Sequence, residues 1–337
     1  MQNSNVLMAQ ALSTLKGNIE RTGDPLGFCK PYWVEWADGL TLPKQGATVL
    51  MTARMYQMLP YVQQATKLTS SVRPLLPLLG SKVCRKIAAA GFNATGETLL
   101  RFKARGREGD KIREKGRRTL LGIESALRRV AVEPAYLYDK DPYSGVLLYD
   151  LGLETAAVPH MRQVYQLLKE QGACEVITTD PHTTYMLKEV YPRHIPQFDL
   201  RIRHYLEILS NRMEVLSGRT VKAMPEAMVL HDSCVMTRDL GIIEQTRRVA
   251  ARLGITILEP ENAGPNTACC GGPVEYAYAD LSAQVSNIRI KELAAVSRDI
   301  LVACPICLLN LIKYEASYDI KIWDIGELLH MVHGNLA

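Results

Sequence analysis

Residues 299–315, DILVACPICLLNLIKYE, hold the features that decide the fold. The apolar run 299–303 has the composition of a strand that is buried on both faces of a sheet. It leads directly into CPIC (304–307), and proline is favoured at the first position of a helix. The apolar residues that follow therefore predict a helix. A buried strand that feeds a helix is part of a β-α-β unit, so this stretch predicts a parallel sheet covered by helices.

The same alternation extends toward the N-terminus of this stretch. AMVLH (227–231) and ITILEP (255–260) predict strands, and GIIEQTRRVAARL (241–253) has helical spacing. A loop that carries CCGG (269–272) precedes a long helix expected at about 275–298. Parallel strands end at one edge of their sheet, and ligands of open α/β sheets bind at that edge. We therefore expect the cysteines of this half to meet at a common binding edge.

The N-terminal half repeats this plan. ATVLMTA (47–53) and EVITTD (175–180) predict strands, and VPHMRQVYQLLKEQ (158–171) predicts a helix between them. The residues that take the places of Cys304, Cys307 and CCG (269–271) are, in that order, Asp180, Thr183 and YSG (143–145). We interpret this pattern as a duplicated domain whose first copy has lost its thiols.

These patterns predict an α/β fold with two pseudo-repeated, Rossmann-like parallel-sheet domains. We expect an N-terminal approach segment at 1–46, a degenerate first domain at 47–216 and a complete second domain at 217–337. A basic helical insertion is expected in the first domain at about 66–140.

The expected insertion has 11 Lys and Arg against 4 Asp and Glu between residues 101 and 130. The simplest interpretation is a helix with a solvated charged face. The alternative is a docking surface for an acidic partner or for an anionic membrane. Nucleic acid is disfavoured, because aromatic side chains for base stacking are nearly absent here and the net charge of the chain is only +5.

The composition is that of an ordinary globular protein, with 47% hydrophobic and 22% charged residues. No apolar run approaches the roughly 18 residues that cross a bilayer, and residues 1–23 lack the pattern of a signal peptide. We therefore expect a cytoplasmic protein, or one bound peripherally to the inner face of the membrane. Clustered cysteines in that reducing compartment indicate metal or redox chemistry rather than a disulfide framework.

Five of the eight cysteines crowd the second half: Cys234, Cys269, Cys270, Cys304 and Cys307. Thiolates are soft ligands that select iron–sulfur clusters, zinc or Cu(I). Gly271 and Gly272 would let the loop bend so that adjacent thiols converge. Five thiols exceed the four ligands of a tetrahedral zinc site, which favours a larger group. Zinc, a metal-free redox disulfide between Cys304 and Cys307, and buried cysteines that only pack are the alternatives.

The other three cysteines are weaker candidates. Cys29 is flanked by Phe28 and Tyr32 and is expected to pack in the core, with a ligand or reactive role as the alternative. Cys84 and Cys174 are expected to be inert.

The second half holds four short segments at defined spacing: HDSC followed by Arg238 (231–238), ACCGG (268–272), ACPIC (303–307) and DIGELLH (324–330). Together they resemble the CCG, or cysteine-rich, domain family, whose best-known member is the B subunit of heterodisulfide reductase. Ser233 stands where the family usually has proline. The resemblance covers roughly 225–332 strongly, and 47–57 and 143–216 as a degenerate copy.

The resemblance implies one iron–sulfur cluster of the [4Fe-4S] kind, with the non-cubane form of that family as the expected type. Its implied ligands are Cys234, Cys269, Cys270, Cys304 and Cys307. The implied catalytic residues are Cys234, Cys269 and Cys270, with His231, Gly271 and Arg238 around them. Because the first copy has no matching thiols, two facing clusters are not implied. Tyr143, Asp180 and His182 would lie near the rim of the substrate pocket or serve only as structural filler.

The function that the resemblance implies is that of an iron–sulfur subunit of a heterodisulfide-reductase-like complex, such as those of sulfur oxidisers. Such a subunit acts on a disulfide, a thiol or a sulfur-carrying substrate. The implied partners are a ferredoxin-like subunit of the C type and a flavin subunit of the A type, and this chain has no nucleotide-binding motif of its own. The alternatives are an electron relay in a quinone-linked dehydrogenase complex and a zinc-binding structural subunit.

Overall fold

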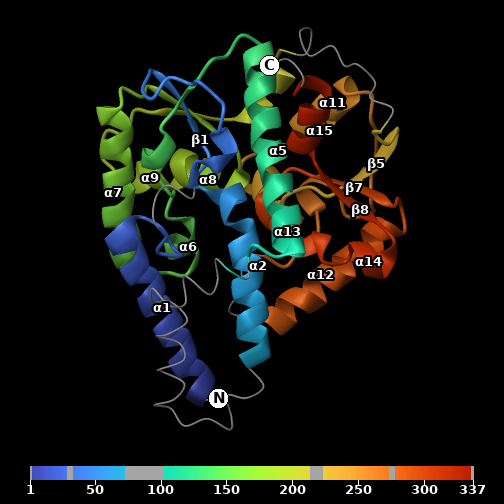
Figure 1. Ribbon diagram of the computed structural model, residues 1–337, viewed down its shortest axis with the longest axis horizontal. Helices are drawn as coiled ribbons and strands as arrows, with labels where there is room; N and C mark the ends of the chain where they lie inside the picture. The colour runs from blue at the N-terminus through green and yellow to red at the C-terminus, as the bar shows by residue number, and fades with distance from the viewer. Residues whose placement is uncertain are drawn as a thin grey trace.

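The computed structural model describes residues 2–28, 33–72, 102, 104–212, 223–272 and 278–334. Within these residues the strands form two four-stranded sheets, and every strand pair in them is parallel. Figure 1 shows the first sheet and its helices on the left and the second sheet with its helices on the right. The predicted α/β fold with two pseudo-repeated, Rossmann-like domains is confirmed.

The first half contains, in chain order, α1 (Gln2–Thr22), β1 (Thr48–Met51), α2 (Met55–Val72), α5 (Arg107–Arg129), β2 (Ala135–Tyr136), α6 (Val146–Asp150), α7 (Glu154–Glu170), β3 (Glu175–Thr178), α8 (Pro181–Tyr185), the π-helical turn η5 (Met186–Val190), α9 (Tyr191–His194), β4 (Arg201–His204) and α10 (Tyr205–Ser210). The second half contains β5 (Ala227–Leu230), the π-helical turn η6 (Val235–Asp239), α11 (Glu244–Arg252), β6 (Thr256–Leu258), α12 (Ala279–Ala294), β7 (Asp299–Val302), α13 (Pro305–Ile312), α14 (Glu315–Tyr318), β8 (Lys321–Asp324) and α15 (Ile325–His333).

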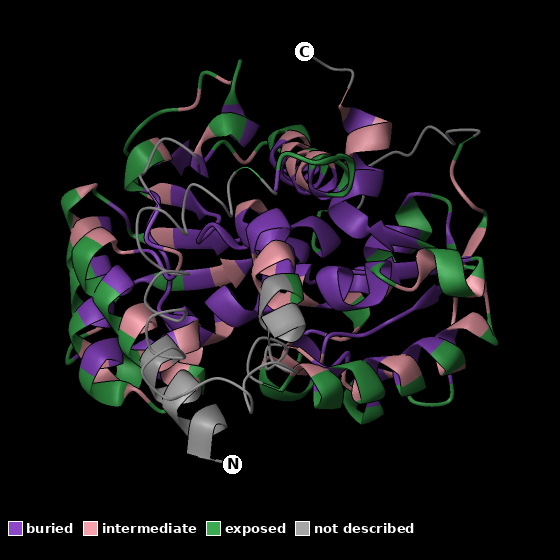
Figure 2. Cartoon of the chain, turned by 60° about the horizontal axis from the view of Figure 1, so that its bottom comes forward, coloured by how far each residue is buried: buried purple, intermediate pink, exposed green. Residues whose placement is uncertain are grey.

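The apolar runs correctly predict β1, β3, β5, β6 and β7, whereas β2, β4 and β8 were not predicted from the sequence. In β1, β3, β5 and β7 the first residue is partly exposed and the next three are buried. Figure 2 shows both sheets as a buried central layer with exposed residues on the outer helices. Parallel strands are covered by helices on both faces, which is why they are apolar throughout rather than alternating.

The two sheets have the same topology. The first has the order β2-β1-β3-β4 and the second has the order β6-β5-β7-β8, so each domain places its second strand at the edge and its first strand beside it. The register is also the same, because Leu50 pairs with Ile177 as Leu230 pairs with Leu301. Counting from these pairs places Arg54 at the position that Cys234 holds in the second sheet.

The duplication continues through the last strand and helix of each domain. β4 runs into α10 as HYLEILS (204–210), and β8 runs into α15 as DIGELLH (324–330). His204 and Asp324 each cap the helix that follows, accepting a backbone N–H with a side-chain atom. The repeat therefore covers the closing segment of both domains.

The basic stretch of the first domain forms α5, which lies between the two domains (Figure 1). One face of α5 is buried against α2 and α15, and a Cβ at Gly122 would collide with the backbone carbonyl of Gly326. Lys115, on this buried face, pairs with Glu327 of α15. The predicted solvated face can therefore be only one side of α5, and the sequence analysis did not foresee that the other side is buried. β2 also lies inside the range expected to be an insertion, and the proposed domain boundaries stay a prediction.

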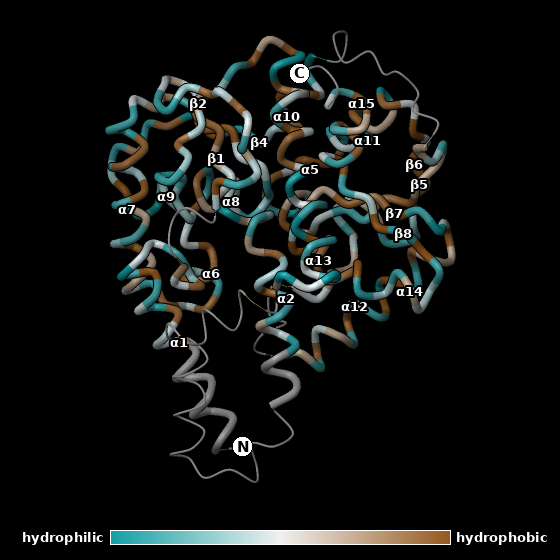
Figure 3. The backbone as a smooth tube through the Cα atoms, in the orientation of Figure 1, coloured by the Kyte–Doolittle hydropathy of each residue, from teal (hydrophilic) through white to brown (hydrophobic). Residues whose placement is uncertain are grey.

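The outer face of α5 is charged but largely paired. Arg117 and Arg118 both reach Glu114, and Lys111 reaches Glu315 of α14. Along α5 the tube in Figure 3 alternates between hydrophilic and hydrophobic residues, because one face of the helix is charged and the other is buried. Pairing of this kind favours a solvated helix face over a patch of free positive charge. Among the described residues, no helix combines the length and the apolar character that a membrane span requires.

Candidate metal centre

The five cysteines of the second half gather at the carboxyl edge of its sheet. Cys234 follows β5 by four residues and precedes η6, and Cys269 and Cys270 lie in the loop before α12. Cys304 is the N-terminal cap of α13, and Cys307 lies in its first turn. Proline at the first helical position and a strand immediately before it fix this geometry, as the sequence predicts.

The thiols form one continuous chain of contacts. Cys234 is in hydrogen-bonding contact with Cys269, which contacts Cys270 in turn. Cys270 contacts Cys307, and Cys307 contacts Cys304. Cys270, Cys304 and Cys307 are buried, whereas Cys234 and Cys269 are partly exposed. The set therefore has a closed side within the protein and an open side that solvent reaches.

The contacts divide the thiols into proton donors and acceptors. The hydrogen bond from Cys234 lowers the pKa of Cys269 to about 2, and the same bond raises the pKa of Cys234. Burial alone would raise the pKa of Cys304, but hydrogen bonds from Cys307 and His182 outweigh it and hold that pKa well below its usual range. Metals bind thiolates, so a metal or cluster held here would displace the protons that these sulfurs share.

Gly271 shapes the loop that brings the adjacent cysteines together. Its φ of +90° lies in the left-handed region, and a Cβ there would lie 2.5 Å from the backbone oxygen of Ser282 in α12. Its N–H lies 3.3 Å from the sulfur of Cys269 and donates to it. Gly272 has no positive φ, so the freedom expected of both glycines is required only at Gly271.

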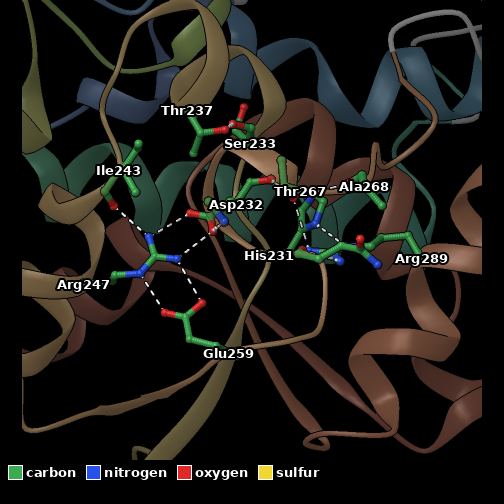
Figure 4. Close-up of polar contacts among 12 residues, drawn as sticks. His231, Asp232, Ser233, Thr237, Ile243, Arg247, Glu259, Thr267, Ala268 and Arg289 are labelled. Atoms are coloured by element: carbon green, nitrogen blue, oxygen red, sulfur yellow. Dashed lines mark hydrogen bonds and ion pairs between the residues drawn. The ribbon is translucent and has the colours of Figure 1, made fainter.

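Asp232 and Arg238 tie the segment after β5 to the loop before the paired cysteines. Asp232 accepts the backbone N–H of Gly264 at 2.7 Å and forms an ion pair with Arg247 at 2.7 Å. Arg238 donates from Nε to the carbonyl of Pro265 at 2.9 Å and also reaches the carbonyl of Thr267. Figure 4 shows the Asp232 part of this network. Both side chains therefore hold Cys234 in register with Cys269 and Cys270.

His231 lies on the protein side of the thiol cluster. One of its ring nitrogens and the sulfurs of Cys270 and Cys307 all lie within 4.8 Å of one another. Nδ1 accepts a hydrogen bond from Nε of Arg289 at 3.0 Å (Figure 4). Nε2 is buried and has no hydrogen-bond partner among the described residues. Burial, with the nearby charge of Arg289, lowers the pKa of His231 to about 3.

Arg289 is the residue of this site that the sequence analysis missed. It lies on α12, its side chain is fully buried, and it also contacts Asn262, Thr267 and Glu292. A signal was available, because Arg289 falls on the apolar face of the predicted helix, beside Ile290 and four residues before Leu293. An arginine is almost never fully buried unless it is paired.

The first domain contributes His182 to the buried side of the cluster. Its imidazole is in hydrogen-bonding contact with the sulfur of Cys304. Burial would lower the pKa of His182, but the contact with Cys304 and the carboxylates of Asp180 and Asp150 raise it to about 9. Of the three first-domain residues expected near the rim, His182 contacts a cysteine directly. Tyr143 and Asp180 are buried within the first domain.

The equivalent edge of the first sheet is filled by charged and hydroxyl groups instead of thiols. Arg54, at the position of Cys234, is buried and pairs with Asp24 at 3.2 Å. It also donates to the carbonyl of Asp141, whose carboxylate accepts the hydroxyl of Thr52 at 2.5 Å. An ion pair therefore occupies the space where the second domain gathers its sulfurs.

The remaining cysteines lie away from the cluster or outside the described residues. Cys174 precedes β3 and is exposed, so it does not fill the core as a small hydrophobe would. The predictions for Cys29 and Cys84 concern residues outside the described part of the chain.

The donor set fits an iron–sulfur cluster better than a zinc ion. All five donors are sulfur, and they number one more than a tetrahedral zinc ion takes. His231 cannot serve as an additional neutral ligand through Nε2, because Nδ1 already accepts a hydrogen bond from Arg289 and the ring proton must then sit on Nε2. A buried N–H next to thiolates is the arrangement that stabilises charge on a cluster.

Comparison with known proteins agrees with this geometry. The family model described as "Cysteine-rich domain", CCG, matches residues 228–312. Residues 228–312 are a CCG domain. This domain spans β5 to α13 and so contains all five clustered cysteines. The resemblance to the CCG family is therefore confirmed, and the match contains the first three of the four segments but not DIGELLH (324–330).

Three curated proteins are similar to longer parts of the chain. A "Probable membrane-anchored ferredoxin" of Chromohalobacter salexigens is 27% identical over 57% of this chain. An "EtfAB:quinone oxidoreductase" of Syntrophomonas wolfei is 25% identical over 60% of it. One subunit of the "Dihydromethanophenazine:CoB--CoM heterodisulfide reductase" of Methanosarcina mazei is 26% identical over 50% of it. The matches cover 30%, 30% and 43% of these relatives, so this chain spans less than half the length of each.

Proposed function

We propose that this protein is an iron–sulfur subunit of an oxidoreductase complex, with a cluster held by Cys234, Cys269, Cys270, Cys304 and Cys307. The observation that carries the proposal is the unbroken chain of thiol contacts at the carboxyl edge of the second sheet. The cluster would supply one-electron transfer to or from a disulfide, a thiol or a sulfur-carrying substrate, and a [4Fe-4S] cluster of the non-cubane kind suits five donors.

The two sides of the site suggest different roles for the cysteines. Cys270, Cys304 and Cys307 are buried and would anchor the cluster. Cys234 and Cys269 are partly exposed and would face an incoming sulfur group. The low pKa of Cys269 keeps its sulfur deprotonated, and the N–H of Gly271 stabilises that charge. Substrate chemistry is therefore proposed on the open side, at Cys234 and Cys269, with Cys270 behind them as a buried ligand.

The names of the relatives support a role in a larger assembly. We propose a ferredoxin-like electron-transfer subunit and a flavin subunit as partners, and a cytoplasmic location in which the thiols stay reduced. One relative is named as a quinone oxidoreductase and another as part of a heterodisulfide reductase. A relay that only passes electrons in a quinone-linked complex is therefore the second candidate, and the partly exposed side would then face a protein partner.

Metal analysis and EPR on anaerobically purified protein test the proposal. We expect about four irons and about four acid-labile sulfides per chain, as in a [4Fe-4S] cluster, and an EPR signal that changes when a thiol substrate analogue is added to the oxidised protein. An EPR signal that ignores thiols would favour the relay. Stoichiometric zinc without sulfide would overturn the proposal and leave a structural subunit.

A matched pair of variants tests the ligand assignment. Cys270→Ser removes a buried thiol from the centre of the contact chain, so we expect loss of most bound iron. Cys174→Ser changes an exposed thiol away from the cluster, so this variant should retain its iron. Equal iron in both variants would contradict the assignment.

A further inference from the structure

Arg289 connects α12 to the segment that holds the thiols. Its guanidinium donates to His231 Nδ1 at 3.0 Å, to the carbonyl of Asn262 at 3.0 Å and to the hydroxyl of Thr267 at 3.2 Å. It also pairs with Glu292 at 2.7 Å. The side chain has no exposed surface. A fully buried arginine carries a large desolvation cost, so these contacts fix its position closely.

The contact with Arg289 determines the tautomer of His231. A guanidinium has only donors, so His231 Nδ1 must be the acceptor in this hydrogen bond. A neutral imidazole has one N–H, which must then lie on Nε2. Nε2 is buried and has no partner among the described residues, while the sulfurs of Cys270 and Cys307 lie within 4.8 Å of a ring nitrogen. Nε2–H is therefore left available to sulfur.

We propose that Arg289 is a positioning residue that holds His231 as an Nε2–H donor to the sulfur side of the cluster, and that this donation raises the reduction potential of the cluster. The inference rests on the proposed iron–sulfur function. Hydrogen bonds to cluster sulfurs stabilise the more negative, reduced state, and they are among the factors that set cluster potentials. The sulfur atoms that accept belong to Cys270 and Cys307 or to the cluster between them.

The chemistry of arginine suits this role. The planar fork lets Nε reach His231 while the two terminal nitrogens hold Thr267 and Asn262 at the same time. A lysine offers a single point of attachment and cannot hold all three groups in one plane. Thr267 also donates to the carbonyl of Asp232, so the same network that orients His231 anchors the loop before the paired cysteines.

Metal-free protein provides the first test, because it does not depend on the cluster. Nitrogen NMR of the histidine side chains in reduced, metal-free protein reports which ring nitrogen carries the proton. We expect His231 to be a pure Nε2–H tautomer in the wild type and in Glu292→Gln, which keeps the Arg289–His231 bond. In Arg289→Met we expect a mixture of tautomers. A pure Nε2–H tautomer in Arg289→Met would overturn the positioning role.

The second test measures the reduction potential of the loaded protein by EPR-monitored titration. In Arg289→Met, and in His231→Met, we expect the ratio of reduced to oxidised cluster at a fixed potential to fall about tenfold, which is a shift of ~59 mV to lower potential for a one-electron couple. Glu292→Gln should stay near the wild-type potential. His231→Gln keeps both an acceptor for Arg289 and an N–H donor, so it should restore most of the potential lost in His231→Met.

Iron content distinguishes a failure of the proposed iron–sulfur function from a failure of the proposed role of Arg289. Wild-type protein without iron and sulfide would overturn the proposed function itself. Wild-type iron content with unchanged potentials in Arg289→Met and His231→Met would overturn only the role of Arg289. If Arg289→Met fails to fold, the pair His231→Met and His231→Gln decides the question, since equal potentials in that pair would refute donation by Nε2–H.

Discussion

The two domains share strand order, register and buried strands, yet they fill the same sheet edge with opposite chemistry. The second domain places five thiols there, and three of them are buried. The first domain places Arg54 at the position of Cys234 and Asp180 at the position of Cys304, and both are buried. The apolar frame of the sheet therefore does not depend on the chemistry at its edge.

The two sheet edges are filled by different kinds of side chain. A sheet edge that faces the other domain must be filled, and a buried polar group must find a partner. The first domain uses the ion pair between Arg54 and Asp24 with hydrogen bonds to Asp141. The second domain gathers thiols, which are small and weakly polar until a metal deprotonates them. The first domain then supplies His182 to this second site rather than binding a cluster of its own.

The largest effect is expected when the first-domain residue is placed in the second domain. Cys304→Asp puts a hard carboxylate in the centre of a soft donor set, so we expect loss of most of the iron. Iron and sulfide analysis of anaerobically purified protein measures it, with circular dichroism as the check on folding. The reciprocal Asp180→Cys should gain no iron, because Arg54 and Thr183 keep their places. Wild-type iron content in Cys304→Asp would contradict the proposed role of Cys304 as a ligand.

The next largest effect is expected on the free energy of unfolding, when the buried ion pair between Arg54 and Asp24 in the first domain is broken. Arg54→Met leaves the carboxylate of Asp24 buried without its charge partner, so we expect a loss of about 3–5 kcal/mol in the free energy of unfolding. Urea denaturation measures the loss. The control is Arg201→Met, whose ion pair with Glu175 is 72% exposed on the arginine side and should cost about 1 kcal/mol or less. Similar losses in the two variants would contradict the role of the buried pair.

Two matched glycines sharpen the comparison. Gly145 and Gly271 hold the same place in the matching segments YSG (143–145) and CCG (269–271), and both have positive φ, at +80° and +90°. Alanine at either should cost about 1–2 kcal/mol from backbone strain. Gly271→Ala also meets the backbone of Ser282, which cannot move aside, for about 1–3 kcal/mol more. Gly145→Ala meets the side chain of His160, which can. Denaturation of both metal-free variants should rank Gly271→Ala as the less stable.

The buried carboxyl group of Asp141 should contribute less to stability as the pH rises through the acidic range. Burial raises the pKa of Asp141 to about 7, so the folded protein holds this proton more tightly than the unfolded chain, whose Asp titrates near 4. The proton stabilises the folded state at low pH, and its contribution is lost between about pH 4 and pH 7, by at most about 1.4 kcal/mol per pH unit. Denaturation at several pH values should show a shallower slope for Asp141→Asn. An unchanged slope would mean that another group, such as Asp324, dominates.

The smallest effect is expected at the contact between the domains. His182→Phe removes the N–H donor to Cys304 but no proposed ligand, so iron content should stay near the wild-type value. The reduction potential should fall by less than the ~59 mV that corresponds to a tenfold change for one electron. An EPR-monitored titration measures it. Loss of iron in this variant would instead make His182 a structural requirement for the cluster.

Local sequence predicted β1, β3, β5, β6 and β7, the main helices and the clustering of five cysteines, but not the strands β2, β4 and β8. The apolar runs predict β5 and β7 because buried parallel strands need no alternation. The segment CPIC marks the start of α13 because proline prefers the first helical turn. α7 begins four residues before the predicted start, because Pro159 lies within the helix and does not open it. α12 begins at Ala279 in the described residues, within the range expected for it.

Only the tertiary structure decided which distant groups surround the thiols. Arg289 reaches His231 across 58 residues of sequence, and His182 approaches Cys304 from the other domain. Neither contact has a local pattern, because each depends on how a helix or a whole domain packs against the sheet. The sequence did not predict the position of α5 between the domains for the same reason, because a count of charged residues does not show which face of a helix is buried. Periodicity and spacing along the chain predict most elements and the clustering of the thiols, whereas long-range packing determines which other groups lie beside those thiols.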